Sequence, residues 1–425
     1  MLDIKLIREK PDYVKEGLQK KGADVALVDQ VIVLDEKRRE LIQQIDTLRA
    51  KKNIAEEKLV RTPNEAKKDI LDVLRQAKTV LEDKEIELNE IETEFKRLMS
   101  LIPNLPLATV PVGHDEKDNV VLREVGNKPR FNFQPLDYLT LAEKLDIIDV
   151  KRAAKTSGSR FGFLKNEGAL LEMALMKFAF DKLTKKGFLP VIPPVMIKPE
   201  AMWAMGYLDR GAEEVYYLPK DDLYLIGTSE QIIGAMHQNE SFQRNELPKR
   251  YISFSTCFRR EAGSYGKDTK GILRVHQFDK AEMFIFTTPE EAQKEHEFLL
   301  SLEEELMQSL GLPYRVLNIC SGDLGDPAAA KFDIEAWMPG QNEGQGQYRE
   351  THSTSNCTDY QARRLNIKYK NEKTNTWEFV YTLNGTAFSQ RPILAIIENC
   401  QTKEGFVRIP KVLLPYMNGI KIIKR

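Results

Sequence analysis

A seven-residue repeat of apolar side chains in residues 27–100 is the feature that most constrains how this chain folds. On the N-terminal side of a short break, the repeating positions are Leu34, Leu41, Leu48 and Ala55, with Ile45 and Leu59 offset between them. On the C-terminal side they are Leu74, Leu81, Leu88 and Phe95, with Ile70, Ala77, Ile91 and Leu98 offset. This is the a/d pattern of a coiled coil, in which each helix presents one apolar seam to a partner helix.

The break between the two repeats reads RTPNEA (61–66) and contains the one proline of residues 27–100. Two helices of similar length joined by a short turn fold back antiparallel, so the two seams are expected to bury each other. At about 1.5 Å per residue, the first helix would be roughly 40 Å long between Leu34 and Val60. We therefore predict an antiparallel two-helix coiled coil over about 27–100, within an N-terminal helical arm of residues 1–108.

Basic residues gather around the turn of this predicted arm. They are Arg49, Lys51, Lys52, Lys58, Arg61, Lys67, Lys68, Arg75 and Lys78. Because a basic surface can follow a phosphate backbone, the tip is a candidate for nucleic-acid binding. Helices that carry charges of both signs are common, however, so the charge pattern by itself favours an ordinary solvated hairpin. The formal net charge of -1 argues against nucleic-acid binding by bulk charge.

The sequence carries no sign of a membrane or secretory protein. It has no apolar run of about 18 residues, and its start, MLDIKLIREKPDYVKEGLQKK, lacks the apolar core of a signal peptide. The cysteines at 257, 320, 357 and 400 are widely spaced and form neither a metal pair nor a disulfide framework. We therefore expect a cytoplasmic protein in a reducing compartment.

Residues 109–425 mix helical stretches with short β-rich runs. Several runs follow one another without an intervening helix, which favours an antiparallel sheet flanked by helices over a doubly wound parallel fold. The sequence has no phosphate-binding loop of the Walker type and no dinucleotide fingerprint. The predicted fold class is α+β.

The stretch FRREAGSYGKDTKGILRVHQFDKAEMF (258–284) joins two strand-like ends through a loop rich in glycine and charge. If the first strand continues, Arg259 and Glu261 share one face; on the second strand, Phe278 and Glu282 share one face. Arginine offers planar donation to phosphate, and phenylalanine can stack on a base. A surface β-hairpin with cross-strand ion pairs explains the same residues equally well.

Two later stretches could complete a phosphate site. In YRETHSTSNCTDYQARR (348–364), Glu350 and Ser353 are hard oxygen ligands suited to Mg²⁺ and phosphate. A polar turn that caps the following helix would use the same residue types, and we interpret His352 as structural. In TLNGTAFSQRPILAIIEN (382–399), Thr386 and Arg391 lie between a strand and an apolar helix, although Arg391 could equally be a surface charge. Taken together, the three stretches predict a nucleoside triphosphate site on an antiparallel sheet.

The sequence resembles the bacterial-type seryl-tRNA synthetases, which are class II aminoacyl-tRNA synthetases, along nearly its whole length. GFLPVIPPV (187–195), residues 258–282 and residues 383–399 resemble the three class II motifs, and LIGTSE (225–230) resembles the family's serine-pocket signature. The segment MWAMGYLDRGAEEVYYL (202–218) departs from the family's usual glycine-rich text. The first motif implies a homodimer, and the helical arm implies binding to tRNA.

The resemblance also implies roles for individual residues, with residues 109–425 as the catalytic class II domain. The ATP-binding positions are Arg259, Arg260, Glu261, Val275, Phe278, Glu350, Thr351, His352, Ser353 and Arg391. The serine-binding positions are Thr228, Ser229, Glu230, Arg259, Glu282, Asn384 and Thr386. Glu350 and Ser353 would bind Mg²⁺, and Arg259 and Arg391 would hold the α- and γ-phosphates during catalysis.

The implied activity is ATP-dependent charging of tRNA(Ser) with L-serine, and of tRNA(Sec) where the host has one. The loop at 262–271 would then lie where the acceptor end of tRNA arrives. One alternative is a paralogue that loads an amino acid onto a carrier protein, which the full-length arm disfavours. A second is a non-catalytic coiled-coil RNA-binding protein, which the joint presence of the arginine, glutamate and phenylalanine positions disfavours.

Overall fold

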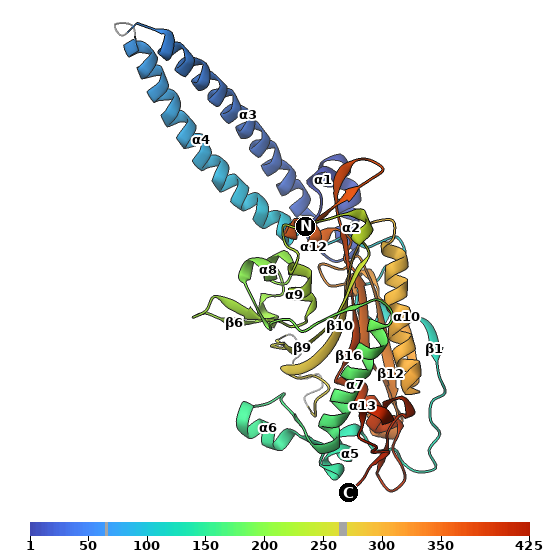
Figure 1. Ribbon diagram of the computed structural model, residues 1–425. Coiled ribbons are helices and arrows are strands. Elements are labelled where there is room, and N and C mark those ends of the chain that lie inside the picture. Colours follow the sequence, from blue (N-terminus) through green and yellow to red (C-terminus); the bar gives the residue numbers. More distant parts are fainter. Residues whose placement is uncertain (64–66, 263–269) are drawn as a thin grey trace. The chain divides into compact units, whose positions relative to one another are not determined.

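The computed structural model describes residues 1–63, 67–262 and 270–425 (Figure 1). They form two compact units, Met1–Pro103 and Asn104–Arg425. Part of the RTPNEA turn and most of the 262–271 loop lie outside the described residues. No helix among the described residues is long and apolar enough to cross a membrane.

The first unit consists of two short helices and a long helical hairpin. The helices are α1 (Ile4–Glu9), α2 (Pro11–Lys20), α3 (Ala26–Arg61) and α4 (Lys67–Leu101). Along α3, Leu41 and Ile45 of the predicted seam are buried, whereas Val60 on the flank is 84% exposed. The predicted hairpin of the α+β fold is therefore confirmed, and the seven-residue repeat supplies the contact between its two helices.

Ion pairs occur at the base of this unit and along the arm. At the base, the buried carboxylate of Asp35 on α3 accepts two hydrogen bonds from Arg8 on α1, at 2.6 and 2.7 Å. Burial acts to raise the pKa of Asp35, but Arg8 and Arg39 outweigh it and lower the pKa. Along the arm, Arg49 on α3 reaches Glu85 on α4 at 2.7 Å. Part of the arm's positive charge is thus already paired in the free protein.

The second unit is built on an eight-stranded sheet. Its strands, in spatial order, are β1 (Val120–Val125), β11 (Tyr314–Asn318), β12 (Ala330–Met338), β13 (Gln347–Asn356), β16 (Tyr381–Ser389), β10 (Gln277–Thr287), β9 (Lys249–Phe258) and β4 (Leu189–Val191). Every neighbouring pair is antiparallel except β4 and β9. The predicted antiparallel sheet flanked by helices is confirmed.

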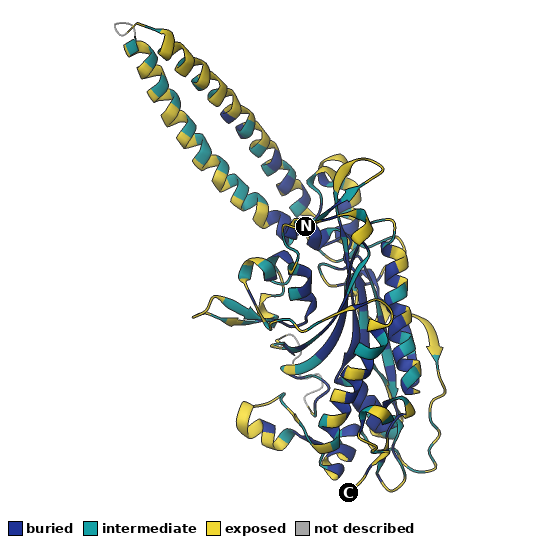
Figure 2. Cartoon of the chain, in the orientation of Figure 1, coloured by how far each residue is buried: buried dark blue, intermediate teal, exposed yellow. Residues whose placement is uncertain are grey.

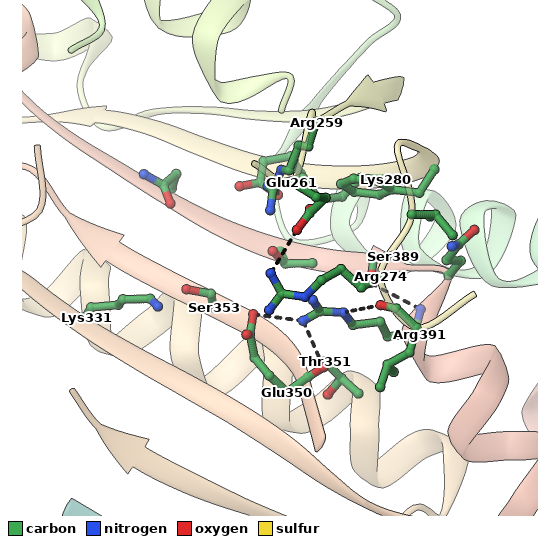
Figure 3. A pocket seen from close by; sticks show the side chains of 17 residues that line it. Arg259, Glu261, Arg274, Lys280, Lys331, Glu350, Thr351, Ser353, Ser389 and Arg391 are labelled. Carbon is green, nitrogen blue, oxygen red and sulfur yellow. Dashed lines mark hydrogen bonds and ion pairs between the residues drawn. The ribbon is translucent and has the colours of Figure 1, made fainter. Parts of the chain in front are cut away.

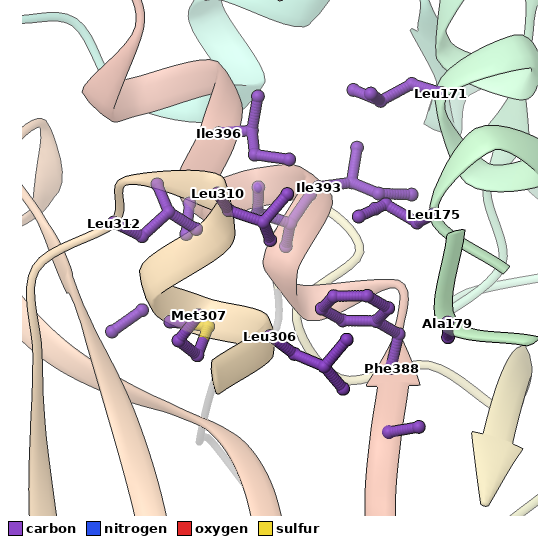
Figure 4. Packing of buried hydrophobic residues seen from close by; sticks show 14 of the residues in the cluster. Leu171, Leu175, Ala179, Leu306, Met307, Leu310, Leu312, Phe388, Ile393 and Ile396 are labelled. Carbon is purple, nitrogen blue, oxygen red and sulfur yellow. The ribbon is translucent and has the colours of Figure 1, made fainter. Parts of the chain in front are cut away.

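Three helices pack on one face of this sheet (Figure 1). They are α7 (Asn166–Thr184), α10 (Ala292–Leu310) and α13 (Arg391–Asn399). Figure 4 shows Leu175 of α7, Leu306 of α10 and Ile393 of α13 converging near Phe388 of β16, and all four side chains are buried. Figure 2 shows the resulting buried centre. The other face of the central strands is left for a polar cavity.

Smaller elements surround the sheet. Among them are α5 (Tyr138–Leu145), β2 (Ile148–Asp149), α6 (Val150–Ser157), β3 (Phe163–Leu164), β5 (Met196–Ile197), α8 (Pro199–Ala204), β6 (Tyr216–Leu218), β7 (Leu223–Leu225), α9 (Glu230–Ala235), β8 (Ser241–Phe242), α11 (Gln341–Gly344), α12 (Tyr360–Leu365), β14 (Lys368–Asn371), β15 (Thr376–Phe379), β17 (Val407–Arg408) and β18 (Ile422–Ile423). Of these, α8 packs against both α9 and α12, and Glu230 is the first residue of α9.

Candidate active site

A polar cavity of about 240 Å³ opens on the sheet face opposite the three helices (Figure 3). Its lining residues come from the segment after β9, from the segment before β10, from β10, β12, β13 and β16, and from the start of α13 with the residue before it. They are Arg259, Glu261, Leu273, Arg274, Val275, Phe278, Lys280, Glu282, Lys331, Glu350, Thr351, Ser353, Asn384, Thr386, Ser389, Gln390 and Arg391. Besides Arg259, the lining contains four more cationic side chains, which are Arg274, Lys280, Lys331 and Arg391. The cavity therefore suits an anionic ligand.

Strand β10 supplies one wall through simple alternation. Phe278, Lys280 and Glu282 point into the cavity, while Ala281 and Met283 between and beyond them lie in the core. The Lys280 ammonium lies 2.8 Å from a carboxylate oxygen of Glu282, and both side chains are buried. The predicted shared face of Phe278 and Glu282 is therefore confirmed.

The end of β9 differs from the expected alternation. The strand stops at Phe258, and Glu261 has a φ of 53°, in the left-handed region. The prediction that Arg259 and Glu261 share a face of an extended strand is wrong, because the chain has left the strand by then. Both side chains still reach the cavity: the Arg259 guanidinium lies 5.2 Å from the Phe278 ring centroid, and Glu261 accepts a 2.8 Å hydrogen bond from Arg274.

A β-bulge brings the two candidate Mg²⁺ ligands together. On β12, Ile334 pairs with His352 and the next residue pairs with Glu350, so Thr351 is an extra residue in β13. In a regular strand, positions 350 and 353 would face opposite sides of the sheet. The bulge reverses the alternation, so Glu350 and Ser353 both line the cavity.

A second bulge lies on β16. Ala281 pairs with Phe388 and Glu282 pairs with Thr386, which leaves Ala387 as the extra residue. Phe388 therefore enters the core although Asn384 and Thr386 face the cavity. The cavity thus owes much of its lining to two bulges, as active sites often do.

Arg391 is the first residue of α13, so the N-terminus of this helix opens on the cavity. Its guanidinium donates to the backbone oxygen of Glu350 at 3.1 Å and lies 3.1 Å from the Glu350 carboxylate. Partial burial acts to raise the pKa of Glu350, but Arg391, Lys331 and Arg259 outweigh it and hold the pKa below its usual value. The Glu350 carboxylate is thus ionised at neutral pH.

The donor set fits a magnesium ion that is shared with a substrate. Among the described residues, no group of three or more histidine, cysteine or acidic side chains could hold a metal by itself. One carboxylate and one hydroxyl, from Glu350 and Ser353, leave most of an octahedral shell open. Mg²⁺ commonly fills such positions with water and substrate phosphate oxygens.

Two of the expected ATP-binding residues lie elsewhere. Arg260 is exposed and its guanidinium lies 5.9 Å from the Tyr216 ring centroid, outside the cavity lining. His352 is buried in the core, where its Nδ1 lies 2.9 Å from Thr351 Oγ1 and burial lowers its pKa to about 4. Neither side chain lines the cavity, so ATP binding by these two positions stays a prediction. The structural interpretation of His352 agrees with its place in the core.

The serine-pocket signature lies deeper than the cavity lining. Thr228, Ser229 and Glu230 are all buried, and Ser229 bonds to Ser253 at 2.7 Å between hydroxyl oxygens. Glu230 faces a second cavity of about 470 Å³, while the negative charge of Glu282 is near enough to act on its pKa. The signature therefore adjoins the first cavity through Glu282.

Sequence reasoning missed several lining residues. Lys280 shares the alternation of Phe278, so the same pattern could have identified it. Lys331 lies on β12 and pairs with Asp333 at 2.9 Å. No local motif around Lys331 indicates that it lines the same cavity as Glu350 and Arg391. Arg274 pairs with Glu261 across a loop that carries no periodic signal.

Comparison with known proteins agrees with this geometry. The seryl-tRNA synthetase N-terminal domain matches residues 1–106, and the class II tRNA synthetase core domain (G, H, P, S and T) matches residues 216–400. The serine--tRNA ligases of Nocardia farcinica and Leifsonia xyli are 44% and 45% identical to the chain. Each match covers at least 98% of this chain and at least 98% of the relative.

A crystal structure of seryl-tRNA synthetase from Pyrococcus horikoshii complexed with ATP superposes with a TM-score of 0.92. Its sequence is 42% identical, and the match covers 100% of this chain and 99% of that one. A Giardia lamblia prolyl-tRNA synthetase, at 17% identity and a TM-score of 0.57, shares the fold alone. The chain belongs to the seryl-tRNA synthetase family of class II aminoacyl-tRNA synthetases.

Proposed function

We propose that this chain is a serine--tRNA ligase, which activates L-serine with ATP and transfers it to the 3′ end of tRNA(Ser). The observation that carries the proposal is the polar cavity, which joins phosphate-binding arginines, a ring for base stacking and a Mg²⁺-compatible pair on one sheet face. The ATP complex of the Pyrococcus horikoshii relative supports ATP as a substrate.

Phe278 and two arginines are the proposed ATP contacts. Adenine would stack on Phe278, a contact worth about 1–3 kcal/mol. Because the Arg259 guanidinium lies over that ring in the free protein, it must turn toward the α-phosphate when adenine arrives. Arg391 at the start of α13 would hold the γ-phosphate, and Glu261 and the Val275 backbone would contact the adenine end.

The serine pocket would be formed by Glu282, Asn384 and Thr386, with the buried Thr228 and Glu230 behind them. The carboxylates of Glu282 and Glu230 would bind the ammonium group of serine, and buried acceptors would pair with the serine hydroxyl. An analogue that lacks this hydroxyl, such as alanine, leaves those acceptors unpaired and is rejected strongly.

The chemistry requires positioning and charge neutralisation. The serine carboxylate attacks the α-phosphorus and pyrophosphate leaves, so no protein nucleophile or general base takes part. Arg259, Arg391 and Lys331 hold the phosphates in line and offset their growing negative charge. Glu350 and Ser353 would bind Mg²⁺, which supplies further positive charge to the phosphate oxygens.

The proposed assembly is a homodimer with the arm bound to tRNA. At the edge of the large sheet, Leu189 is 50% exposed and Ile192 is 79% exposed, and an apolar sheet edge of this kind requires cover. We propose residues 1–108 as the tRNA-binding arm and residues 109–425 as the catalytic domain, with tRNA(Sec) as a second substrate. All four cysteines are free thiols, which suits the reducing cytoplasm.

Serine-dependent exchange of labelled pyrophosphate into ATP, without tRNA, tests the proposal. The wild-type chain should catalyse it, and Arg259→Ala should abolish it while the protein stays folded. Deletion of residues 34–98 should preserve exchange and remove tRNA charging. Exchange without any tRNA charging by the intact chain would favour the carrier-protein alternative. A folded chain without exchange would leave only the non-catalytic alternative.

A further inference from the structure

The hydroxyl of Tyr207 lies 2.9 Å from Glu230 Oε2, to which it donates a hydrogen bond. We propose that Tyr207 is a positioning residue for the serine site, which holds the Glu230 carboxylate in place to face the substrate ammonium. This inference rests on the proposed function. It adds a residue from outside the cavity lining that acts on serine and leaves ATP untouched.

Two donors hold the Glu230 carboxylate, one on each oxygen. Tyr207 donates to Oε2, and Gln361 Nε2 donates to Oε1 at 2.9 Å. Glu230 is 6% exposed and Gln361 is fully buried, whereas Tyr207 is half-buried at the wall of the second cavity. A buried carboxylate fixed in this way retains lone pairs for one further donor.

The local backbone places the Tyr207 hydroxyl with little freedom. Helix α8 ends at Ala204, and Gly206 follows with a φ of 91°. A Cβ at Gly206 would lie 3.1 Å from Pro327 Cγ, so glycine suits both the conformation and the space. Next to this turn, the Trp203 indole donates to Asp209 at 3.0 Å. The turn is therefore fixed on both sides of Tyr207.

Helix α12 ties this turn to the second donor. Arg364 donates to the Trp203 carbonyl at 2.9 Å and to Asp209 at 2.6 Å. Gln361 lies three residues earlier on the same helix, and Thr382 of β16 donates to its amide oxygen at 2.7 Å. That bond orients the amide so that its nitrogen faces Glu230. Both donors to Glu230 thus belong to one connected framework.

The charges around Glu230 make these donors necessary. Burial raises the pKa of Glu230, and Glu282 adds to that effect, whereas Gln361 and Tyr207 act to lower the pKa. Burial and Glu230 also raise the pKa of Tyr207 well above its usual value, so its hydroxyl keeps the proton it donates. Loss of the hydroxyl would weaken the ionised form of Glu230, the form that attracts an ammonium group.

The test is Tyr207→Phe, which removes one oxygen and preserves the ring. In pyrophosphate exchange we expect the KM for serine to rise about tenfold, the loss typical of one hydrogen bond to a charged group. The kcat and the KM for ATP should stay within twofold of wild type. Tyr369→Phe is a matched control, because Tyr369 is buried and donates to the Glu378 carboxylate at 2.8 Å outside both cavities.

Other outcomes would overturn the inference. A serine KM within twofold of wild type in folded Tyr207→Phe would show that the hydroxyl does not position Glu230. An equal rise in both KM values, with a fall in kcat and in melting temperature, would show a purely structural role. If the wild-type chain itself lacks serine-dependent exchange, the proposed function fails as well, so the two failures are distinguishable.

Discussion

The buried ion pair between Lys280 and Glu282 offers the sharpest test of how the site is built. The ammonium and carboxylate are 2.8 Å apart, and their side chains are 8% and 3% exposed. Replacement of Lys280 by methionine keeps most of the length of the side chain and removes its charge. Glu282 would then remain as a buried carboxylate without its partner, inside the proposed serine pocket.

The expected cost follows from this geometry. At 2.8 Å and an effective dielectric constant of about 20, the attraction between two unit charges is about 6 kcal/mol. Part of that attraction only offsets desolvation of the two groups. Removal of one partner from a buried pair typically costs about 3–5 kcal/mol, because the remaining charge stays buried. We expect Lys280→Met to lower the free energy of unfolding of residues 104–425 by this amount.

The double variant Lys280→Met with Glu282→Gln separates stability from function. It removes the uncompensated charge, so at least half of the lost stability should return. Serine activation should not return, because glutamine lacks the carboxylate that we propose faces the substrate. Urea unfolding measures the first quantity and serine-dependent pyrophosphate exchange measures the second. Lys177→Met is the matched control, since Lys177 pairs with Asp181 on the exposed surface of α7 and contributes under about 1 kcal/mol.

Two results would refute the reasoning. If Lys280→Met unfolds at the same urea concentration as the wild type, the pair is not an important source of stability. If the double variant recovers full exchange activity along with stability, the Glu282 carboxylate has no role in binding serine. The second result would also show that serine does not bind at the Glu282 position of β10.

Three further predictions test other parts of the site. Arg391→Lys should raise the KM for ATP about tenfold in exchange assays without changing the KM for serine, because one ammonium cannot replace the planar guanidinium that contacts Glu350. Glu350→Gln should raise the Mg²⁺ concentration for half-maximal exchange by roughly tenfold or more, and an unchanged requirement would exclude Glu350 as a ligand. Burial next to Asp279 raises the pKa of Glu172 from 4.5 to about 7, so its protonated native form contributes stability below pH 4.5 that is lost as the pH rises through 7. Glu172→Gln should therefore raise stability at pH 8 by up to about 3 kcal/mol and flatten the decline seen in urea unfolding between pH 5 and pH 8.

Periodic patterns in the sequence predicted the regular elements of the fold, which are the helical hairpin and the alternating faces of the strands. The seven-residue spacing from Leu34 to Phe95 predicted the helical hairpin, because each helix must bury one seam. Alternation predicted the shared face of Phe278 and Glu282 on β10. The order of β-rich runs without intervening helices predicted the antiparallel sheet, and the class II resemblance, carried by short motifs, predicted the family.

The rest of the site depends on contacts between residues that are far apart in the sequence. Lys331 joins the cavity from β12, and Tyr207 reaches Glu230 from the turn after α8. Neither residue belongs to a local pattern, because its role exists only after the sheet has formed. Strand alternation also could not predict the positive φ of Glu261. A residue in the left-handed region ends the strand, so the alternation of faces no longer applies to its side chain.

The Glu350–Ser353 pair shows how a correct chemical hypothesis can depend on an irregularity. Two residues three positions apart in a regular strand lie on opposite faces of the sheet and cannot bind one ion. The sequence therefore supports a shared Mg²⁺ site only if β13 contains one extra residue between them. The structure contains that residue at Thr351, which the register with β12 identifies. A cluster of polar residues in a strand, spaced three apart, is thus evidence for a bulge as well as for a ligand site, and here the two inferences support each other.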